Sequence, residues 1–366
     1  MKTTKTLGVG IIGASAERGW AKESHVPAVQ KLAGLELVAV ATGSQPTADA
    51  AAKAFGAKAG YGDAEDLIQD PNVDLVTVAV KVPDHRKLVL AALSAGKHVY
   101  CEWPLGRDVA ESEKLAAAVR QAGVHVAIGL QTRFSPAACR ARELVAAGAI
   151  GRVLSARLYD GTIAFAPKIG SADAYLEEAG NGATLVTIHG GHALDLAVAV
   201  LEPLENLTAL TTTQYPEIEV GDEGKKQART IPDHLLVQAR LASGGALSVE
   251  VAGGCPPDAT PFHLEVSGED GKLLLEGGAI RGFQSGRLRL VLKEKPQFLD
   301  EGEMAVMPDT AANVAGVYVA LRDDILQGTS TVPDFDHAVR LARLIDAICT
   351  SGERGNRESA ADWPTH

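Results

Sequence analysis

The 366-residue sequence has few cysteines, and the four that it has lie far apart, without a CxxC pair. They are Cys101, Cys139, Cys255 and Cys349. This spacing excludes a disulfide framework and a cysteine zinc site, and it is typical of reduced thiols in a cytoplasmic protein. The sequence also lacks an apolar run of membrane-spanning length, an internal repeat and a low-complexity segment. We therefore expect no membrane partner.

Positive charge is the other shortage. The chain carries 35 basic and 46 acidic residues, a net charge of −11. This balance argues against a broad nucleic-acid-binding surface. We expect a small-molecule substrate and no nucleic-acid partner. Hydrophobic residues make up 46% and charged residues 22%, which are ordinary globular values, and the length allows two domains.

The first 130 residues alternate short apolar runs with helical stretches, a pattern typical of a parallel sheet covered by helices. The segment 73–80 is almost continuously apolar, as expected for a strand buried on both faces. We predict a Rossmann-type, doubly wound domain over 1–130. Its strands are expected at 6–12, 35–41, 73–80, 98–101 and 124–130, and its helices near 26–34, up to 55, at 87–95 and at 112–122.

After residue 130 the pattern changes to hairpins, with glycine-rich turns between 235–241 and 246–251 and between 262–266 and 272–275. Further strands are expected at 153–159 and 288–292, and helices at 136–147, 189–200, 311–326 and 335–348. We predict an α/β domain over 131–366 with a largely antiparallel open sheet. The last helix is a candidate to pack back on the first domain. An open sheet needs cover, so a homodimer or homotetramer through this sheet is expected.

A glycine loop joins the first predicted strand to the first helix. Gly13, Ser15 and Gly19 stand where a dinucleotide-binding loop has its glycines, although Ser15 replaces one of them and Gly19 comes one residue late. Glycine lets the backbone approach a pyrophosphate, and helix-start amides donate to it. An ordinary strand-to-helix turn is the alternative interpretation, but the position after an N-terminal strand favours the cofactor loop.

The end of the second predicted strand lacks the acid that NAD-preferring sites present to the ribose. Thr42 and Ser44 stand there, with a glycine between them, and leave room for a 2′-phosphate. No arginine follows to pair with that phosphate. We therefore predict NADP as the cofactor, with NAD as the alternative.

Five segments together resemble the Gfo/Idh/MocA oxidoreductase family. They are the glycine loop, 82–85 (VPDH), 95–99 (AGKHV), 102–104 (EWP) and 191–195 (GHALD). The segments 16–21 (AERGWA) and 101–105 (CEWPL) resemble the branch that holds the fungal galactose-pathway co-repressor and its bacterial relatives. The resemblance covers nearly the whole chain. It implies a nucleotide-binding domain followed by an α/β substrate domain.

The resemblance also implies where the nicotinamide would lie. Glu102 and Pro104 match the ends of the family's Glu-Lys-Pro motif, and Trp103 replaces its lysine. An indole cannot exchange protons near neutrality, so Trp103 is expected to stack on a ring or wall off the site. Val82 and His85 are expected to line the cofactor pocket. A further family aspartate falls at Ile188.

Hydride transfer at an alcohol carbon needs a group that takes the hydroxyl proton. His192 matches the family's substrate-site histidine and is the first candidate; packing at a helix start is the alternative. Lys81 is the second candidate, because it follows an apolar strand at the edge where parallel sheets bind ligands. Burial would suit Lys81 to this role, whereas a solvated strand-end lysine is an equal alternative.

Polar side chains near these candidates are expected to bind substrate. Gln131 and Arg133 follow the last strand of the first domain, and Asp195 lies one helical turn beyond His192. An interdomain ion pair is an equal alternative for Arg133. His189, His192 and Asp195 stand three apart, but without further ligands we expect no metal site.

These features predict an NAD(P)-dependent oxidoreductase that acts on a sugar, a cyclitol or a similar polyhydroxylated molecule. The missing motif lysine and the likeness to a co-repressor keep one alternative open. In that alternative the chain is a non-catalytic dinucleotide sensor that binds a partner protein.

Overall fold

Two units make up the chain in the computed structural model, which describes residues 5–221, 223–359 and 363–364. The first unit comprises Met1–Gln131 and Glu301–Val339, and the second comprises Thr132–Asp300 and Arg340–His366. The sequence analysis placed everything after residue 130 in one domain. The structure groups Glu301–Val339 with the first unit, because α8 (Asp309–Gln327) packs against α1 (Val26–Lys31) and β6 (Val126–Gly129).

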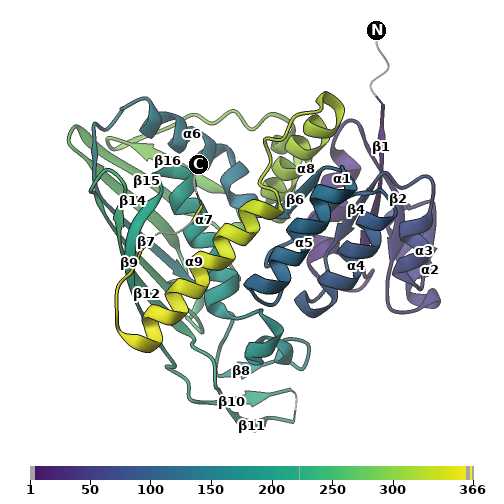
Figure 1. Cartoon of the computed structure of the whole chain (residues 1–366), viewed down its shortest axis with the longest axis horizontal. Coiled ribbons are helices and arrows are strands. Elements are labelled where there is room, and N and C mark those ends of the chain that lie inside the picture. The colour runs from purple at the N-terminus through teal and green to yellow at the C-terminus, as the bar shows by residue number, and fades with distance from the viewer. Residues whose placement is uncertain (1–4, 222, 360–362, 365–366) are drawn as a thin grey trace. The chain divides into compact units, whose positions relative to one another are not determined.

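A six-stranded parallel sheet forms the centre of the first unit, in the order β3-β2-β1-β4-β5-β6 (Figure 1). The order reverses at β1, whose neighbours are β2 and β4, as in a doubly wound nucleotide-binding fold. All six residues of β1 are buried, which is why this strand is uniformly apolar or glycine. The bounds are β1 Leu7–Ile12, β2 Leu35–Ala41, β3 Ala59–Tyr61, β4 Leu75–Val78 and β5 His98–Glu102.

The remaining helices of this unit follow the strands in turn. They are α2 (Gln45–Phe55), α3 (Ala64–Gln69), α4 (Val82–Ser94) and α5 (Val109–Ala122). The Asp108 side chain caps α5 by accepting from the Glu111 amide, and Gly123 ends that helix in the left-handed region. The short pair β3 and α3 was not predicted. A π-helical turn, Ala21–His25, precedes α1 where the sequence predicted the helix to start near residue 26.

The second unit is built on a nine-stranded sheet, in the order β17-β16-β15-β14-β7-β13-β12-β9-β18. Only the β7–β13 pair is parallel, so the predicted largely antiparallel sheet is confirmed. The bounds are β7 Val153–Gly161, β9 Leu204–Thr212, β12 His234–Leu241, β13 Ala246–Ala252, β14 Phe262–Gly268, β15 Gly271–Gly277, β16 Leu288–Leu292, β17 Lys295–Pro296 and β18 Glu358–Ser359. A separate three-stranded sheet joins β8 (Lys168–Ile169), β10 (Glu217–Val220) and β11 (Lys225–Ala228).

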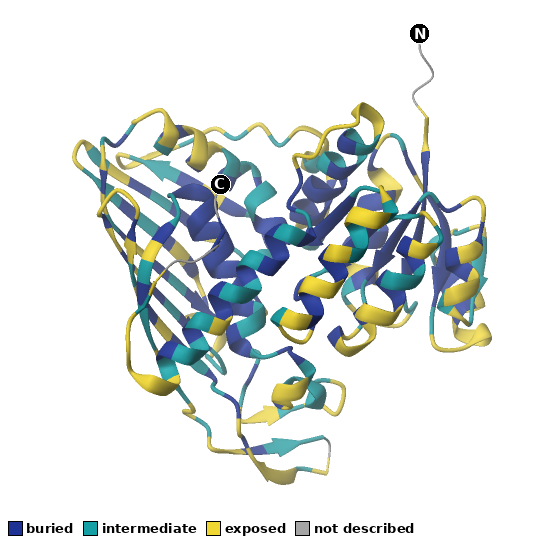
Figure 2. Ribbon diagram, viewed as in Figure 1, coloured by how far each residue is buried: buried dark blue, intermediate teal, exposed yellow. Residues whose placement is uncertain are grey.

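Helices cover the inner face of the large sheet. α6 (Pro136–Ala146) packs on β15 and β16, and α7 (Gly191–Val200) packs on β7 and β13. Along β12 the buried residues Leu235 and Val237 alternate with the exposed Leu236 and Gln238, a strand with one buried face (Figure 2). α9 (Phe335–Arg354) closes the chain. No helix in the described ranges is long and apolar enough to cross a membrane.

Candidate functional site

The turn after β1 requires glycine at its first position. Gly13 has φ +97°, and a Cβ there would lie 2.3 Å from the Ala79 carbonyl oxygen. Its amide donates to the Ala41 carbonyl at 2.9 Å, which ties the end of β1 to the end of β2. Only glycine fits this position without moving the backbone.

The rest of the loop is held open by its own contacts. Ser15 Oγ accepts from the Glu17 amide at 3.2 Å, and Gly19 has φ +112°, with no described atom within 4 Å of a built Cβ. Lys22 Nζ donates to the Ala16 and Glu17 carbonyls at 2.7 and 3.0 Å. Lys22 thus brings positive charge to the loop, a contribution that sequence spacing did not reveal. The side of the loop at Gly19 is open.

Three hydroxyl groups gather where β2 passes into α2. Thr47 Oγ1 lies 2.7 Å from Thr42 Oγ1 and 2.8 Å from Ser44 Oγ. Ser44 is the N-cap residue of α2, and Ser44 and Thr47 are exposed. The structure therefore brings the two predicted ribose-end residues together and adds Thr47, which sequence reasoning missed.

The Glu-Trp-Pro motif follows directly from β5. Glu102 ends the strand, Trp103 is 7% exposed, and the peptide bond between Trp103 and Pro104 is cis. A Cβ on Gly129 of the neighbouring β6 would lie 2.8 Å from Glu102 Oε1. Glycine at 129 therefore leaves room for the Glu102 carboxylate at the edge of the sheet where the motif lies.

A buried hydrogen-bond chain holds that carboxylate. His25 Nε2 lies 3.0 Å from Glu102 Oε1, His25 Nδ1 lies 3.0 Å from the Tyr318 hydroxyl, and that hydroxyl lies 2.7 Å from Thr77 Oγ1. His25, Thr77 and Tyr318 are fully buried. Burial and the negative charge of Glu102 raise the pKa of the neighbouring Tyr100. His25, Thr77 and Tyr318 were not predicted, because they come from three segments that are distant in sequence from the motif.

His85 is a buried link between two loops of the first unit. Its Nδ1 lies 3.0 Å from the Pro104 carbonyl and its Nε2 lies 3.1 Å from the Val80 carbonyl. Burial lowers its pKa. The ring is 1% exposed, so it supports the motif loop from behind; the sequence analysis expected it to line a pocket. Val82, also predicted to line the pocket, is buried as the first residue of α4.

Lys81 does not have the buried position that a role in proton transfer would favour. It is the N-cap residue of α4 and is exposed. The burial that would have suited it to proton transfer is therefore missing.

In the second unit, Arg133 and Asp195 form a buried ion pair, with 3.3 Å between Arg133 Nε and Asp195 Oδ2. Both residues belong to this unit, so the ion pair lies within it. Gln131 and Thr132 precede Arg133 and are buried, and within the described ranges Gln131 Oε1 and Thr132 Oγ1 have no hydrogen-bond partner. Buried polar atoms without a hydrogen-bond partner are uncommon in native folds. Thr132 was not predicted.

His192 is buried in the first turn of α7. Burial, strengthened by the charge of His189 and opposed by that of Asp195, lowers its pKa to about 3. His189 lies on the π-helical turn Val186–Gly190 and pairs through Nδ1 with Asp160 Oδ2 at 3.1 Å. In the described part of the chain no three His, Cys, Asp or Glu side chains are grouped to hold a metal.

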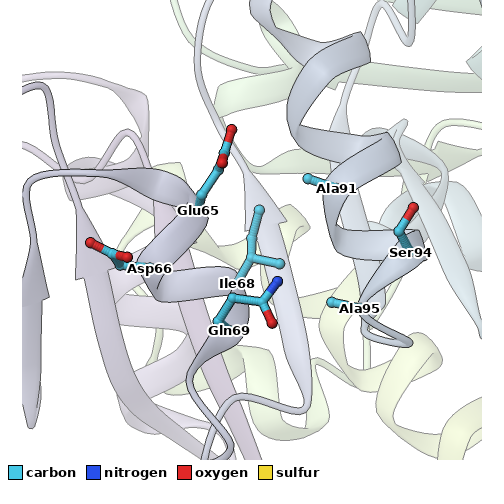
Figure 3. A pocket seen from close by; sticks show the side chains of 7 residues that line it. All are labelled: Glu65, Asp66, Ile68, Gln69, Ala91, Ser94 and Ala95. Carbon is cyan, nitrogen blue, oxygen red and sulfur yellow. The ribbon is translucent and has the colours of Figure 1, made fainter.

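A surface hollow between α3 and α4 is separate from all these residues (Figure 3). Its lining is largely aliphatic and acidic, and the figure shows Glu65 and Asp66 at its rim. Glu65 pairs with Lys87 at 2.8 Å. This hollow holds none of the predicted site residues.

Comparison with known proteins connects this geometry to a family. Residues 7–130 match the model of the oxidoreductase family with the NAD-binding Rossmann fold, and residues 136–277 match that of the Gal80p C-terminal domain. The chain is 30% identical to dehydrogenase aclE of Aspergillus oryzae, over 96% of this chain and 98% of that protein. It is 29% identical to inositol 2-dehydrogenase of Acidothermus cellulolyticus, over 75% and 74% of the two chains.

Among solved structures, a super-repressor mutant of Gal80p from Saccharomyces cerevisiae superposes with a TM-score of 0.84 at 25% identity. The match covers 96% of this chain and 97% of that one. These matches confirm the predicted fold class and the resemblance to the family and to the branch that contains the co-repressor. The chain therefore belongs to the Gfo/Idh/MocA oxidoreductase family, whose amino-terminal domain has the NAD-binding Rossmann fold.

Proposed function

We propose that this protein is an NAD(P)-dependent oxidoreductase that interconverts a hydroxyl and a carbonyl group on a sugar, a cyclitol or a similar polyhydroxylated molecule. The observation that carries the proposal is the glycine-dependent loop at Gly13, at the end of β1 in a member of an oxidoreductase family. A relative named inositol 2-dehydrogenase supports the substrate class.

The first unit would hold the nucleotide. Gly13, Ser15 and Gly19 fit its phosphates, while Glu102, Trp103 and Pro104 border the nicotinamide. His85 and Val82 fix the loops on which these residues lie. When bound, the nicotinamide accepts or supplies the hydride.

NADP is our proposed form of the cofactor. Thr42, Ser44 and Thr47 present hydroxyl groups at the start of α2, and none of the three is acidic. Hydroxyl donors at a helix start suit a phosphate better than an acid would.

The second unit would bind the polyol. His192 and Asp195 are buried polar groups, and Arg133, which pairs with Asp195, directly follows Gln131 and Thr132 in the sequence. A neutral His192 can hydrogen-bond a substrate hydroxyl, and its low pKa keeps it neutral at physiological pH. Trp103 would supply an apolar wall in place of the lysine's charge. Lys81, being exposed, would act only by charge at the end of β4.

Homodimerisation through the outer face of the nine-stranded sheet is also proposed. Leu210 and Leu236 are opposite each other on β9 and β12 and are 53% and 38% exposed. Charges elsewhere on that face pair within it, such as Arg289 with Glu276. A neutral face with exposed leucines suits a second copy of itself. Light scattering after size exclusion should give a dimer or tetramer for the wild type and a monomer for Leu236→Arg.

The proposed activity is tested by incubating purified protein with NADP⁺ or NAD⁺ and a panel of polyols, aldoses and cyclitols. We expect nicotinamide reduction with at least one member, and loss of binding and turnover in Gly13→Ala. Tight nucleotide binding without turnover across the panel, in both directions, would refute the enzymatic proposal.

A second function is favoured by the match of residues 136–277 to the Gal80p C-terminal domain. In this alternative the protein is a dinucleotide-dependent regulator that binds a partner protein. The motif lysine, which an enzyme of the family would use, is replaced here by Trp103. Affinity capture of one stoichiometric partner only in the presence of nucleotide, by a protein without turnover, would favour the regulator.

A further inference from the structure

Asp160 and His189 form a buried pair, and neither residue has a role in the proposed function. Asp160 lies on β7, and His189 lies on the π-helical turn that leads into α7. The distance from His189 Nδ1 to Asp160 Oδ2 is 3.1 Å, and the two side chains are 4% and 0% exposed. The Phe165 ring meets the imidazole edge to face, with 6.1 Å between ring centroids.

This pair is incompletely satisfied, unlike the other large buried ion cluster of the unit. Arg229 binds both oxygens of Glu177, at 2.8 and 2.7 Å, and one oxygen of Asp233, at 2.9 Å. The other oxygen of Asp233 accepts from the Gln214 amide. Asp160 Oδ1, in contrast, is buried and has no hydrogen-bond partner among the described residues. A buried acceptor without a donor has lost its hydration and gained no hydrogen bond. A carboxylate that served only packing would therefore lower the stability of the fold in this position.

The carboxylate determines which nitrogen of His189 is basic. When Nδ1 donates to Asp160, the lone pair resides on Nε2, which becomes the proton acceptor of the ring. A carboxylate behind the ring also stabilises the imidazolium that forms when Nε2 takes a proton. Asp160 therefore orients and supports a general base.

His192 is less suited to that task. Its pKa of about 3 reflects burial first and the charge of His189 second. A base this weak takes up little of a hydroxyl proton near neutral pH. The two histidines influence each other's charge, so a proton on His189 disfavours a second proton on His192. His189, in contrast, has the Asp160 carboxylate paired with its Nδ1.

We propose that His189, oriented by Asp160, is the group that exchanges the substrate proton, and that His192 binds the substrate as a neutral hydrogen-bonding group. His189 Nε2 would take up the hydroxyl proton as the carbinol carbon becomes a carbonyl carbon, and the oxidised nicotinamide, when bound, would accept the hydride from that carbon. This inference rests on the proposed function. His189 is the catalytic residue in it, and Asp160 is a positioning residue.

The kinetic test compares His189→Gln, Asp160→Asn and His192→Gln with the wild type, on whichever substrate the panel identifies. We expect kcat to fall about 10²–10⁴-fold in His189→Gln, with nucleotide affinity unchanged. In Asp160→Asn kcat should fall less, and in His192→Gln the main effect should be a higher KM. His125→Gln is the control, because this partly exposed histidine lies outside the proposed site and should leave kcat unchanged.

A spectroscopic test does not depend on turnover. In a long-range ¹H–¹⁵N spectrum of the full protein, the His189 signals are identified by their loss in His189→Gln. We expect protonated Nδ1 and unprotonated Nε2 in the wild type near neutral pH, and loss of this preference in Asp160→Asn. The Nε2-protonated tautomer in the wild type would overturn the proposal.

The outcomes separate the two claims. An active wild type with an active His189→Gln variant refutes the role of His189 and leaves the proposed function intact. An inactive wild type that binds nucleotide refutes the proposed function, and with it this catalytic assignment.

Discussion

His25 Nε2 lies 3.0 Å from Glu102 Oε1, and the same ring reaches the Tyr318 hydroxyl through Nδ1, also at 3.0 Å. Tyr318 lies on α8, more than two hundred residues after the motif that it supports. The hydrogen-bond chain ends at Thr77 on β4, and β4 lies next to β5 in the sheet. The position of the motif glutamate is therefore supported by residues from three other elements, which are the π-helical turn Ala21–His25, β4 and α8.

Removing the Tyr318 hydroxyl should weaken this support. In Tyr318→Phe, His25 Nδ1 and Thr77 Oγ1 each lose a partner in a fully buried place. We expect the free energy of unfolding to fall by about 1–3 kcal/mol, measured by urea denaturation. Tyr61→Phe is the matched control, because the Tyr61 bond to Asp70 is only partly buried. An equal loss in both variants would contradict a special role for the buried chain.

Gly13→Ala should weaken nucleotide binding. The added Cβ would meet the Ala79 carbonyl oxygen at 2.3 Å, and the backbone φ of +97° is unfavourable for alanine. Isothermal titration with NADP⁺ should show affinity reduced at least about tenfold, or roughly 1.4 kcal/mol. Gly56→Ala is the control, since Gly56 also has a positive φ but has open space around a built Cβ. That variant should lose about 1 kcal/mol of stability and keep nucleotide affinity; unchanged binding by Gly13→Ala would contradict the loop's role.

Arg229→Met should be strongly destabilising. The guanidinium compensates the buried carboxylates of Glu177 and Asp233 and donates to the Phe165 and Ala166 carbonyls. Without it two buried acids remain unpaired, so we expect a loss of about 3–5 kcal/mol by chemical denaturation. Lys226→Met breaks only the exposed pair with Glu217 and should leave stability unchanged. A small effect at Arg229 would show that water reaches the cluster.

Acid should destabilise the protein through His192. The folded state lowers the pKa of this side chain from 6.5 to about 3. The unfolded chain therefore binds the proton first as pH falls below 6.5, and stability decreases until the folded form also protonates near pH 3. From about pH 7.5 to 5.5 the loss attributable to His192 should be about 1.4 kcal/mol. The His192→Gln variant should show a correspondingly shallower pH dependence of its unfolding free energy; identical slopes would contradict the burial argument.

Much of the fold could be predicted because its signals are local. The apolar run at β4, the helix-ending Gly123 and the hairpin turn at Gly244 are each visible within a few residues. β9 was missed because its residues alternate only weakly between buried and exposed, and α3 because it is six residues long. The return of Glu301–Val339 to the first unit depends on packing that no local pattern encodes.

The candidate site could be predicted where its residues belong to a sequence motif. Its other residues were missed because only the folded chain brings them together. Gly13 and Glu102 belong to recognisable segments. His25, Tyr318 and Asp160 do not, since each has a hydrogen-bond partner that is distant in sequence. For Lys81 the sequence left a buried catalytic lysine and a solvated strand-end lysine as equal alternatives, and at the start of α4 it is exposed.

The discontinuous first unit has a consequence for synthesis of the protein. A ribosome completes β6 near residue 129, but α8 and its Tyr318 emerge only after the strands from β7 to β17 have been translated. Until then the face of α1 that receives α8 has no cover, and His25 has no phenol to bind. The nascent nucleotide-binding half is therefore completed late, after most of its neighbour has left the exit tunnel.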